Sequence, residues 1–130
     1  KRLAGKIDRV LVDAPCSGLG TLRRNPDLKW RQSPQAIDEL AVKQRAILYA
    51  AGELLKPGGR LVYATCSVLA RENREVVEQF LADRPDFQPV RCQQALEESH
   101  IALDSGDFLE LRPQTHETDA FFAAVMQRRA

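Results

Sequence analysis

The stretch that decides the fold is Ile7-Asp8-Arg9-Val10-Leu11-Val12, which stops at Asp13-Ala14-Pro15-Cys16. A short run of branched aliphatic residues that ends at an aspartate and a proline is typical of a buried strand followed by a loop. Arg60-Leu61-Val62-Tyr63-Ala64-Thr65 repeats this arrangement and stops at Cys66. The sequence therefore predicts two buried strands, each followed closely by a thiol.

Helical patterns lie after each of these strands. Ser33 and Pro34 have the residue types of an N-cap and a first helical position, and Pro57-Gly58-Gly59 ends the pattern. Between them, apolar residues at three- and four-residue spacing form one face: Ile37, Leu40, Ala41, Ile47, Leu48, Ala51, Leu54 and Leu55. A second helix is expected over residues 72 to 82, with its apolar residues facing inward: Val76, Val77, Phe80 and Leu81.

The pattern in the last third of the sequence predicts shorter and less regular elements. Phe87 to Gln93 is expected to be a half-buried strand in which Cys92 fills the core. Residues 94 to 117 are expected to be irregular apart from a short strand at Phe108 to Leu111, and a final strand is expected over Ala120 to Met126. The alternation of strands and helices indicates an α/β fold with parallel strands.

Both thiols are expected at one rim of the sheet. Ligands of parallel α/β sheets bind at the carboxyl ends of the strands, which is where Cys16 and Cys66 lie. A thiol there is a candidate nucleophile, although a cysteine at a strand end is structural more often than catalytic. Asp13 could form an Asx-turn, accept a hydrogen bond from a ligand, or donate one if it is protonated.

Basic residues gather in the long segment between Cys16 and Ser33. Arg23, Arg24, Lys29 and Arg31 are candidate contacts to a phosphate backbone, because positive charge on a loop beside a nucleophile suits one, and the neighbouring Trp30 suits stacking. A solvated loop with Trp30 packed against the body explains the same residues equally well.

Composition narrows the class of protein. The 130 residues are 44% hydrophobic and 28% charged, which is typical of one soluble globular domain, and the net charge of +1 identifies no partner. No apolar run approaches the roughly 20 residues of a membrane span, and residues 1 to 5 do not resemble a signal peptide. Three cysteines without metal-like spacing predict reduced thiols, a cytoplasmic protein and no metal site.

Four motifs in order resemble the Sun (Fmu) family of RNA cytosine-5 methyltransferases, over about residues 6 to 127. They are Asp13-Ala14-Pro15-Cys16-Ser17-Gly18, Arg24-Asn25-Pro26-Asp27-Leu28-Lys29-Trp30, Tyr63-Ala64-Thr65-Cys66-Ser67 with Glu72-Asn73, and Thr118-Asp119-Ala120-Phe121-Phe122-Ala123. Two residues depart from the usual pattern, since Arg74 stands in place of an acid and Ala120 in place of a glycine. Bacterial enzymes that methylate small-subunit ribosomal RNA are the most similar in pattern.

The resemblance implies the C-terminal half of a Rossmann-like methyltransferase fold. Residues 1–130 would hold strands four to seven of a mixed sheet, with the last strand antiparallel and inserted beside the fifth. The first three strands and the glycine loop for S-adenosylmethionine would precede residue 1, so the fragment alone is expected to be inactive. Without a neighbouring strand, Ile7 to Val12 would be an exposed apolar edge, for which we expect pairing into a homodimer or poor solubility.

The resemblance also implies a chemistry. Cys66 would attack carbon 6 of a cytosine in RNA, carbon 5 would take the methyl group from S-adenosylmethionine, and Cys16 would assist release. Asp13 would lie at the cofactor and target-base site, Lys29 would contact the substrate, and the cytosine would be single-stranded or flipped out of a duplex. Two alternatives remain open, a non-catalytic RNA-binding fragment and a dithiol redox protein.

Overall fold

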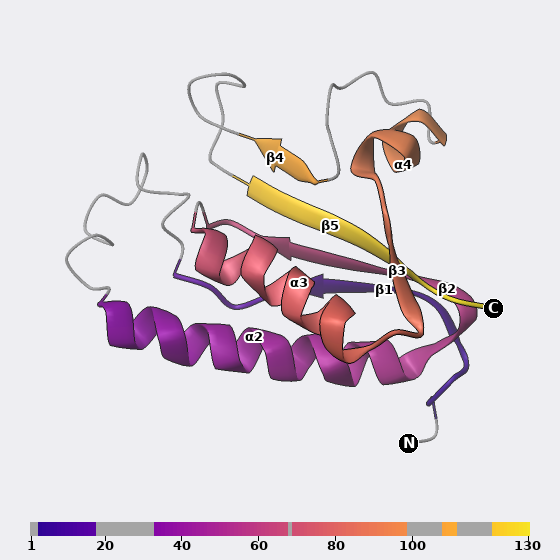
Figure 1. Ribbon diagram of the computed structural model, residues 1–130, viewed down its shortest axis with the longest axis horizontal. Helices are drawn as coiled ribbons and strands as arrows, with labels where there is room; N and C mark the ends of the chain where they lie inside the picture. Colours follow the sequence, from indigo (N-terminus) through magenta and orange to yellow (C-terminus); the bar gives the residue numbers. More distant parts are fainter. Residues whose placement is uncertain (1–2, 18–32, 68, 99–107, 112–120) are drawn as a thin grey trace.

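The computed structural model describes residues 3–17, 33–67, 69–98, 108–111 and 121–130. The strands of this part of the chain form one mixed sheet, in the order β1-β2-β5-β3 with β4 beside β5 (Figure 1). In chain order, the elements are β1 (Ile7–Asp13), α2 (Pro34–Leu54), β2 (Leu55–Thr65), the 3₁₀ helix η2 (Ala70–Glu72), α3 (Arg74–Asp83), β3 (Phe87–Val90), α4 (Cys92–Glu98), β4 (Leu109–Leu111) and β5 (Phe121–Arg128).

The direction of the last strand is as expected. β1 and β2 are parallel, whereas β5 runs antiparallel to both β2 and β3, so β3 is parallel to β2. β5 therefore lies between β2 and β3 as an inserted antiparallel strand, and β3 and β4 share its second edge. The expected mixed α/β sheet, with its last strand antiparallel, is confirmed.

Two helices, α2 and α3, pack on the same face of the sheet (Figure 1). The core between them is built from alternate residues of the strands and from one stripe of each helix: Val12, Leu48, Ala51, Leu61, Tyr63, Val76, Val77, Phe80, Phe122, Ala124 and Met126. Burial of such side chains contributes about 1.5–3 kcal/mol each relative to exposure. Most of the apolar stripe predicted for each helix faces the sheet, but Ile47, which was placed in the stripe of α2, is 40% exposed.

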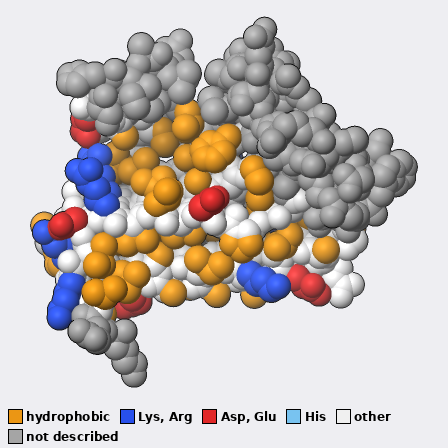
Figure 2. All heavy atoms as spheres, turned by 180° about the vertical axis from the view of Figure 1, so that it is seen from behind, with side chains coloured by type: hydrophobic (Ala, Val, Ile, Leu, Met, Phe, Trp, Pro, Cys, Tyr) orange, Lys and Arg blue, Asp and Glu red, His pale blue; other side chains and the backbone are white. Residues whose placement is uncertain are grey.

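The opposite face of the sheet is apolar and partly open. Leu11 is 69% exposed, and its cross-strand neighbours Val62 and Val125 are only partly buried. Figure 2 shows hydrophobic side chains gathered on this side of the molecule. The expectation that the whole run from Ile7 to Val12 is buried was wrong, since Val12 is its one buried residue. β1 pairs with β2 alone among the described strands, as expected for an exposed edge, and the homodimer stays a prediction.

The first helix begins as the sequence predicts but ends earlier. The Ser33 hydroxyl accepts a hydrogen bond from the Ala36 amide at 3.1 Å, which is the expected N-cap. The helix stops at Leu54, and Leu55 already pairs with β1, so Pro57-Gly58-Gly59 lies within the span of β2 instead of ending a helix. Between the pairs Ile7–Leu55 and Arg9–Arg60, β1 advances two residues and β2 five, so this segment bulges out of the ladder.

Glycine is required at that bulge. Gly58 has a φ of 86°, a left-handed conformation that side chains disfavour. A Cβ on Gly59 would lie 2.8 Å from the Leu55 side chain and 2.9 Å from the Lys56 carbonyl oxygen.

Two predictions in the last third of the chain were wrong. The strand expected to reach Gln93 ends at Val90, because Cys92 opens the short helix α4, which also replaces the irregular structure expected from residue 94 to Glu98. Cys92 is 3% exposed and so fills the core as expected, but from a helix. The short strand near Phe108 is confirmed as β4. The second predicted helix starts at Arg74, after a 3₁₀ turn.

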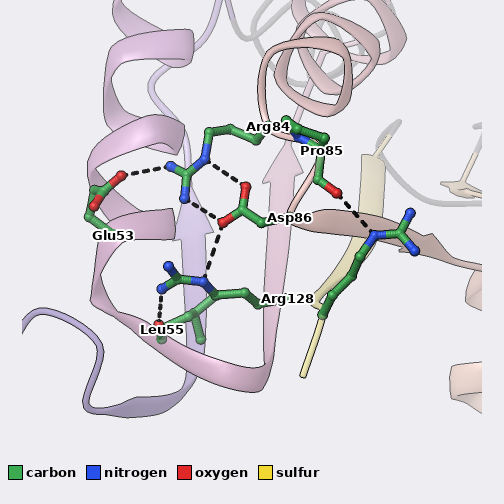
Figure 3. Close-up of polar contacts among 7 residues, drawn as sticks. Glu53, Leu55, Arg84, Pro85, Asp86 and Arg128 are labelled. Atoms are coloured by element: carbon green, nitrogen blue, oxygen red, sulfur yellow. Dashed lines mark hydrogen bonds and ion pairs between the residues drawn. The ribbon is translucent and has the colours of Figure 1, made fainter.

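An ion-pair cluster closes the other end of the sheet, at the amino ends of β2 and β3 (Figure 3). The Arg84 guanidinium donates to both carboxylate oxygens of Asp86 at 2.9 and 2.8 Å, and to Glu53 at 2.7 Å. Arg128 lies 3.3 Å from Asp86 and donates to the Leu55 carbonyl oxygen. This Asp86 cluster joins the end of α2, the turn before β3 and the end of β5.

No helix in the described ranges is long and apolar enough to cross a membrane.

Candidate active site at the carboxyl ends of β1 and β2

The two thiols predicted to share one rim are in contact. Cys16 Sγ and Cys66 Sγ are 3.3 Å apart, and both residues are partly exposed. This distance is that of two thiols in contact, since the sulfurs of a disulfide are about 2.05 Å apart. The strand register brings them level, because Asp13 pairs with Ala64 and the Ala14 amide donates to the Ala64 carbonyl oxygen at 2.9 Å.

A buried carboxyl group lies behind the residues that follow both cysteines. Glu72 is 0% exposed. Its Oε1 accepts from the Ser17 amide at 2.7 Å, and its Oε2 accepts from the Ser17 hydroxyl at 2.8 Å and from the Ser67 hydroxyl. Ser17 and Ser67 are themselves 2% exposed. One carboxyl group therefore joins the loop of Cys16 to the loop of Cys66.

Gln44 fixes the other side of the Cys16 loop. This side chain comes from the centre of α2 and is 0% exposed. Its amide nitrogen donates to the Pro15 carbonyl oxygen at 2.7 Å and to Glu72 Oε1 at 3.4 Å. Cys16 thus lies between two residues that are both held by buried polar side chains.

Asn73 plays the corresponding part for the Cys66 loop. The Asn73 side chain accepts from the Thr65 hydroxyl and donates to the Ser67 carbonyl oxygen at 2.9 Å. The Ser67 amide in turn donates to the Thr65 hydroxyl oxygen at 3.2 Å. Thr65 is 0% exposed and Asn73 is 5% exposed, so buried side chains hold the backbone on both sides of Cys66.

Tyr63 completes a buried polar layer beneath the two cysteines, which also contains Gln44, Thr65, Glu72 and Asn73. Its hydroxyl donates to the Glu72 carbonyl oxygen at 2.6 Å. Burial raises the pKa of the Tyr63 hydroxyl far above its usual range, and the nearby Glu72 carboxyl and Cys16 thiol raise it further. Tyr63 therefore remains a neutral donor at physiological pH and holds the backbone of Glu72 in place.

The other predicted site residues have different outcomes. Asp13 is exposed at the end of β1, three residues before Cys16, on the same rim. Arg23, Arg24, Lys29, Trp30 and Arg31 lie outside the described residues, as does Ala120. In the part of the chain that the structure describes, no group of three or more His, Cys, Asp and Glu side chains is arranged to hold a metal ion.

Arg74, the departure beside the Glu72-Asn73 pair, points away from this layer. Its guanidinium lies 2.6 Å from the Glu110 carboxylate and 4.9 Å from the centre of the Phe108 ring. It therefore links α3 to β4 and leaves the Glu72 carboxyl group to its neutral donors.

Sequence reasoning missed the buried polar layer, although one signal for it was present. Gln44 lies three residues after Ala41 and four before Leu48, so a polar side chain interrupts the predicted apolar face of α2. Such a residue is buried only if it has hydrogen-bond partners. For Glu72, the only signal was its place in a motif, which does not reveal that its side chain turns inward to Ser17.

Chemically, the arrangement offers two accessible thiols in contact on a rigid support. In such a pair, one sulfur can bond to a substrate atom while the other takes a proton from, or gives one to, the neighbouring substrate atom. Each cysteine is partly exposed. Its neighbours Ser17, Thr65 and Ser67 are buried, and Pro15 is held through its carbonyl oxygen.

Comparison with known proteins identifies the family of the chain. The sequence model of the family described as 16S rRNA methyltransferase RsmB/F matches residues 1–127. The chain is 41% identical over 122 residues to a probable ribosomal RNA small subunit methyltransferase B of Synechocystis sp., covering 94% of this chain and 27% of that protein. It is 47% identical over 120 residues to ribosomal RNA small subunit methyltransferase B of Sodalis glossinidius, covering 92% of this chain and 26% of that protein.

A solved structure has the same fold. The crystal structure of NSun6 from Pyrococcus horikoshii with SFG, an analogue of S-adenosylmethionine, matches at a TM-score of 0.72 and 27% identity, covering 92% of this chain and 29% of that one. The chain thus spans only 26 to 27% of the length of the two curated relatives.

Proposed function

Because the chain belongs to the 16S rRNA methyltransferase RsmB/F family, we propose that its full-length protein methylates carbon 5 of a cytosine in small-subunit ribosomal RNA. The observation that carries the proposal is the 3.3 Å contact between Cys16 Sγ and Cys66 Sγ at the carboxyl ends of two parallel strands. Cytosine carbon 5 is a poor nucleophile, so its methylation needs a group that adds to carbon 6 and another that later assists loss of the carbon 5 proton. Two thiols in contact match these two needs.

Cys66 is the nucleophile in this proposal. In its thiolate form it bonds to carbon 6, and the electron pair of the carbon 5–carbon 6 double bond moves toward carbon 5 and the ring. Carbon 5 would then bond to the methyl group, whose bond to the sulfonium sulfur breaks, so that the sulfur keeps the electron pair as a neutral thioether. Cys16, as a thiolate, removes the remaining carbon 5 proton, the double bond re-forms, and the bond between carbon 6 and Cys66 breaks.

S-adenosylmethionine supplies the methyl group on a sulfonium when it is bound. The exposed carboxylate of Asp13 fits a role at this cofactor, because it lies on the same rim and accepts hydrogen bonds from hydroxyl or ammonium groups. In the proposal, Asp13 also contacts the target base, where a hydrogen bond would stabilise charge in the adduct. The NSun6 structure with SFG supports this choice of cofactor.

We further propose that the remaining cofactor contacts come from the part of the full-length protein that precedes this chain. The first three strands and the glycine loop would lie there, so residues 1–130 alone would not methylate RNA. Arg23, Arg24 and Lys29 would contact RNA phosphates, and an rRNA substrate would be met in the cytoplasm.

Trapping tests the nucleophile in the full-length protein. RNA with 5-fluorocytosine at the target position lacks the proton that must leave carbon 5, so the adduct with Cys66 should accumulate. Cys66→Ala should abolish the adduct, whereas Cys92→Ala, a change at the buried third cysteine, should retain it. An adduct that survives Cys66→Ala would show the assignment to be wrong.

Cys16→Ala separates the two thiols. With ordinary RNA, this variant should form the adduct and release it slowly, so that a covalent complex accumulates without trapping. A variant that forms no complex would instead make Cys16 a participant in attack.

The same sulfur contact also favours a second candidate, a dithiol redox function. That function predicts turnover of disulfide substrates and no adduct with RNA. A purely RNA-binding fragment predicts neither, but an affinity that falls with salt and with neutralisation of Arg23, Arg24 and Lys29.

A further inference from the structure

We infer that Glu72 is the positioning residue that sets the distance between the two thiols, by binding both of their loops through one buried carboxyl group. The consequence for catalysis rests on the proposed function, whereas the geometric part does not.

The first observation is that one oxygen atom receives both loops. Glu72 Oε2 accepts from the Ser17 hydroxyl at 2.8 Å and from the Ser67 hydroxyl, and these are the residues immediately after Cys16 and Cys66. Ser17 is 55 positions from Glu72 in sequence, and Ser67 is five positions away. Gln44 reaches the Cys16 loop and Asn73 reaches the Cys66 loop, but Glu72 contacts both directly.

The second observation is the contrast in burial between the cysteines and their neighbours. Ser17 and Ser67 are 2% exposed and Thr65 is 0% exposed, whereas Cys16 and Cys66 are partly exposed. A cysteine places its sulfur by one side-chain torsion with three staggered positions, so fixing the adjacent backbone nearly fixes the sulfur. The separation of 3.3 Å is therefore set by what holds the neighbouring residues.

The third observation is that this hold is specific to an acceptor with two oxygens. Glu72 Oε1 faces the Ser17 amide at 2.7 Å, which can only donate, and Oε2 faces two hydroxyl groups. A glutamine at this position keeps the acceptor for the Ser17 amide, and the serine hydroxyls can turn to accept from its NH₂ group. A leucine of similar size offers no acceptor, so both loops lose their common partner.

The test measures the closeness of the thiols directly, in the full-length protein. Glutathione disulfide takes two electrons from the thiols of Cys16 and Cys66, which lose their protons and form a disulfide, and is reduced to two glutathione thiols. The equilibrium constant of this exchange reports the effective concentration of one thiol at the other. Quenching by alkylation and mapping of the Cys16–Cys66 peptide by mass spectrometry give this constant.

Glu72→Leu should lower the effective concentration by about 100-fold, the effect expected of a displacement near 1 Å, and Glu72→Gln should recover most of this loss. Glu75→Gln is the matched control, because Glu75 is an exposed acid three residues further on, in the first turn of α3, and pairs only with Arg71 among the ion pairs described. It should leave the constant within about twofold of wild type, as is usual for surface substitutions. Near-UV circular dichroism identifies which variants are folded.

If Glu72→Leu does not fold, Ser17→Ala and Ser67→Ala decide, since each removes one hydroxyl from the carboxyl group. Each should lower the constant by severalfold. Unchanged constants in all the folded variants would overturn the inference, whatever the protein does to RNA.

Methylation kinetics complete the experiment. In a folded Glu72 variant, kcat should fall in parallel with the thiol constant while KM for RNA stays unchanged, because Glu72 is fully buried and offers RNA no contact. A rise in KM at constant kcat would also overturn the inference. Absence of methylation by the wild type would contradict the proposed function but leave the thiol measurement valid.

Discussion

Glu72 and Asp86 lie at opposite ends of the sheet, and each gathers several hydrogen-bond donors from distant segments. Glu72 is fully buried, and the donors found for it are hydroxyl groups, an amide of the backbone and a side-chain amide. The Asp86 side chain is 37% exposed, and it is bound by two guanidinium groups, those of Arg84 and Arg128. Two acids with similar tasks therefore work in different environments.

The difference shows which kind of contact fixes geometry. In a dry site, a donor that loses its acceptor pays the full cost of desolvation, about 1–3 kcal/mol, so Glu72 has few alternatives to its present partners. At the surface, water and salt replace a lost ion pair, and such pairs contribute about 0–1 kcal/mol. We expect the thiol end of the sheet to be rigid and sensitive to substitution, and the Asp86 end to tolerate substitutions.

The largest effect should come from Glu72→Leu. It removes the buried carboxyl group that accepts from the Ser17 amide and from two buried hydroxyl groups, so we expect a loss of about 3 kcal/mol or more in the free energy of unfolding. The urea midpoint of the full-length protein, followed by circular dichroism, measures it. Asp86→Leu is the paired control and should cost much less, and equal losses at the two acids would refute the comparison.

Tyr63→Phe should have the next largest effect. It removes the hydroxyl that donates to the Glu72 carbonyl oxygen at 2.6 Å and leaves that buried oxygen without this donor, at a cost of about 1–2 kcal/mol. Tyr49→Phe is a suitable control, because the Tyr49 hydroxyl donates to Asp83 at the surface. The same urea titration compares them, and a Tyr63→Phe variant as stable as Tyr49→Phe would mean that the buried layer relaxes easily.

Asp86→Asn should destabilise by about 0.5–1 kcal/mol at neutral pH, since it removes a half-exposed partner of two guanidinium groups. The hydrogen bond from the Arg84 guanidinium lowers the pKa of Asp86, against an opposing effect of partial burial. The ionised carboxylate therefore stabilises the folded state fully above its usual pKa, and this stabilisation is lost as pH falls through the lowered pKa.

The measurement that checks Asp86 is the difference in urea midpoint between wild type and Asp86→Asn, from neutral pH down through the acid range. The difference should shrink toward zero in acid and should also shrink in high salt, which screens exposed pairs. A difference independent of both pH and salt would mean that Asp86 acts by packing and not by charge.

The contrast also explains what the sequence predicted and what it did not. The helices and most strands were predictable because periodicity reports which side of an element is apolar, as at Val76, Val77 and Phe80. The meeting of Cys16 with Cys66 was predictable from the rule for carboxyl ends of parallel strands. The family was predictable because four motifs stand in order, and the match over residues 1–127 confirms it.

What failed depends on tertiary context. The predicted burial of β1 was wrong in part, because an aliphatic run looks the same in a central strand and in an edge strand. In this edge strand, Leu11 is 69% exposed. Cys92 was placed in a strand because no glycine or proline lies between Val90 and Gln93, so the turn into α4 has no local signal. The Glu72 layer was missed because buried hydrogen bonds between distant residues leave no periodicity.

The smallest effect is expected where both partners are most exposed, at the ion pair of Lys56 with Asp8, whose side chains are 52% and 71% exposed. Lys56→Gln and Asp8→Asn should each change the free energy of unfolding by no more than about 0.5 kcal/mol. A double-mutant cycle isolates their coupling from other effects of each change. Because Asp8 lies in the edge strand β1 and Lys56 in the bulge of β2, a coupling above about 1 kcal/mol would show that this bulge is held by charge. It would also mean that the Asp86 end of the sheet tolerates substitutions less well than the contrast between Glu72 and Asp86 implies.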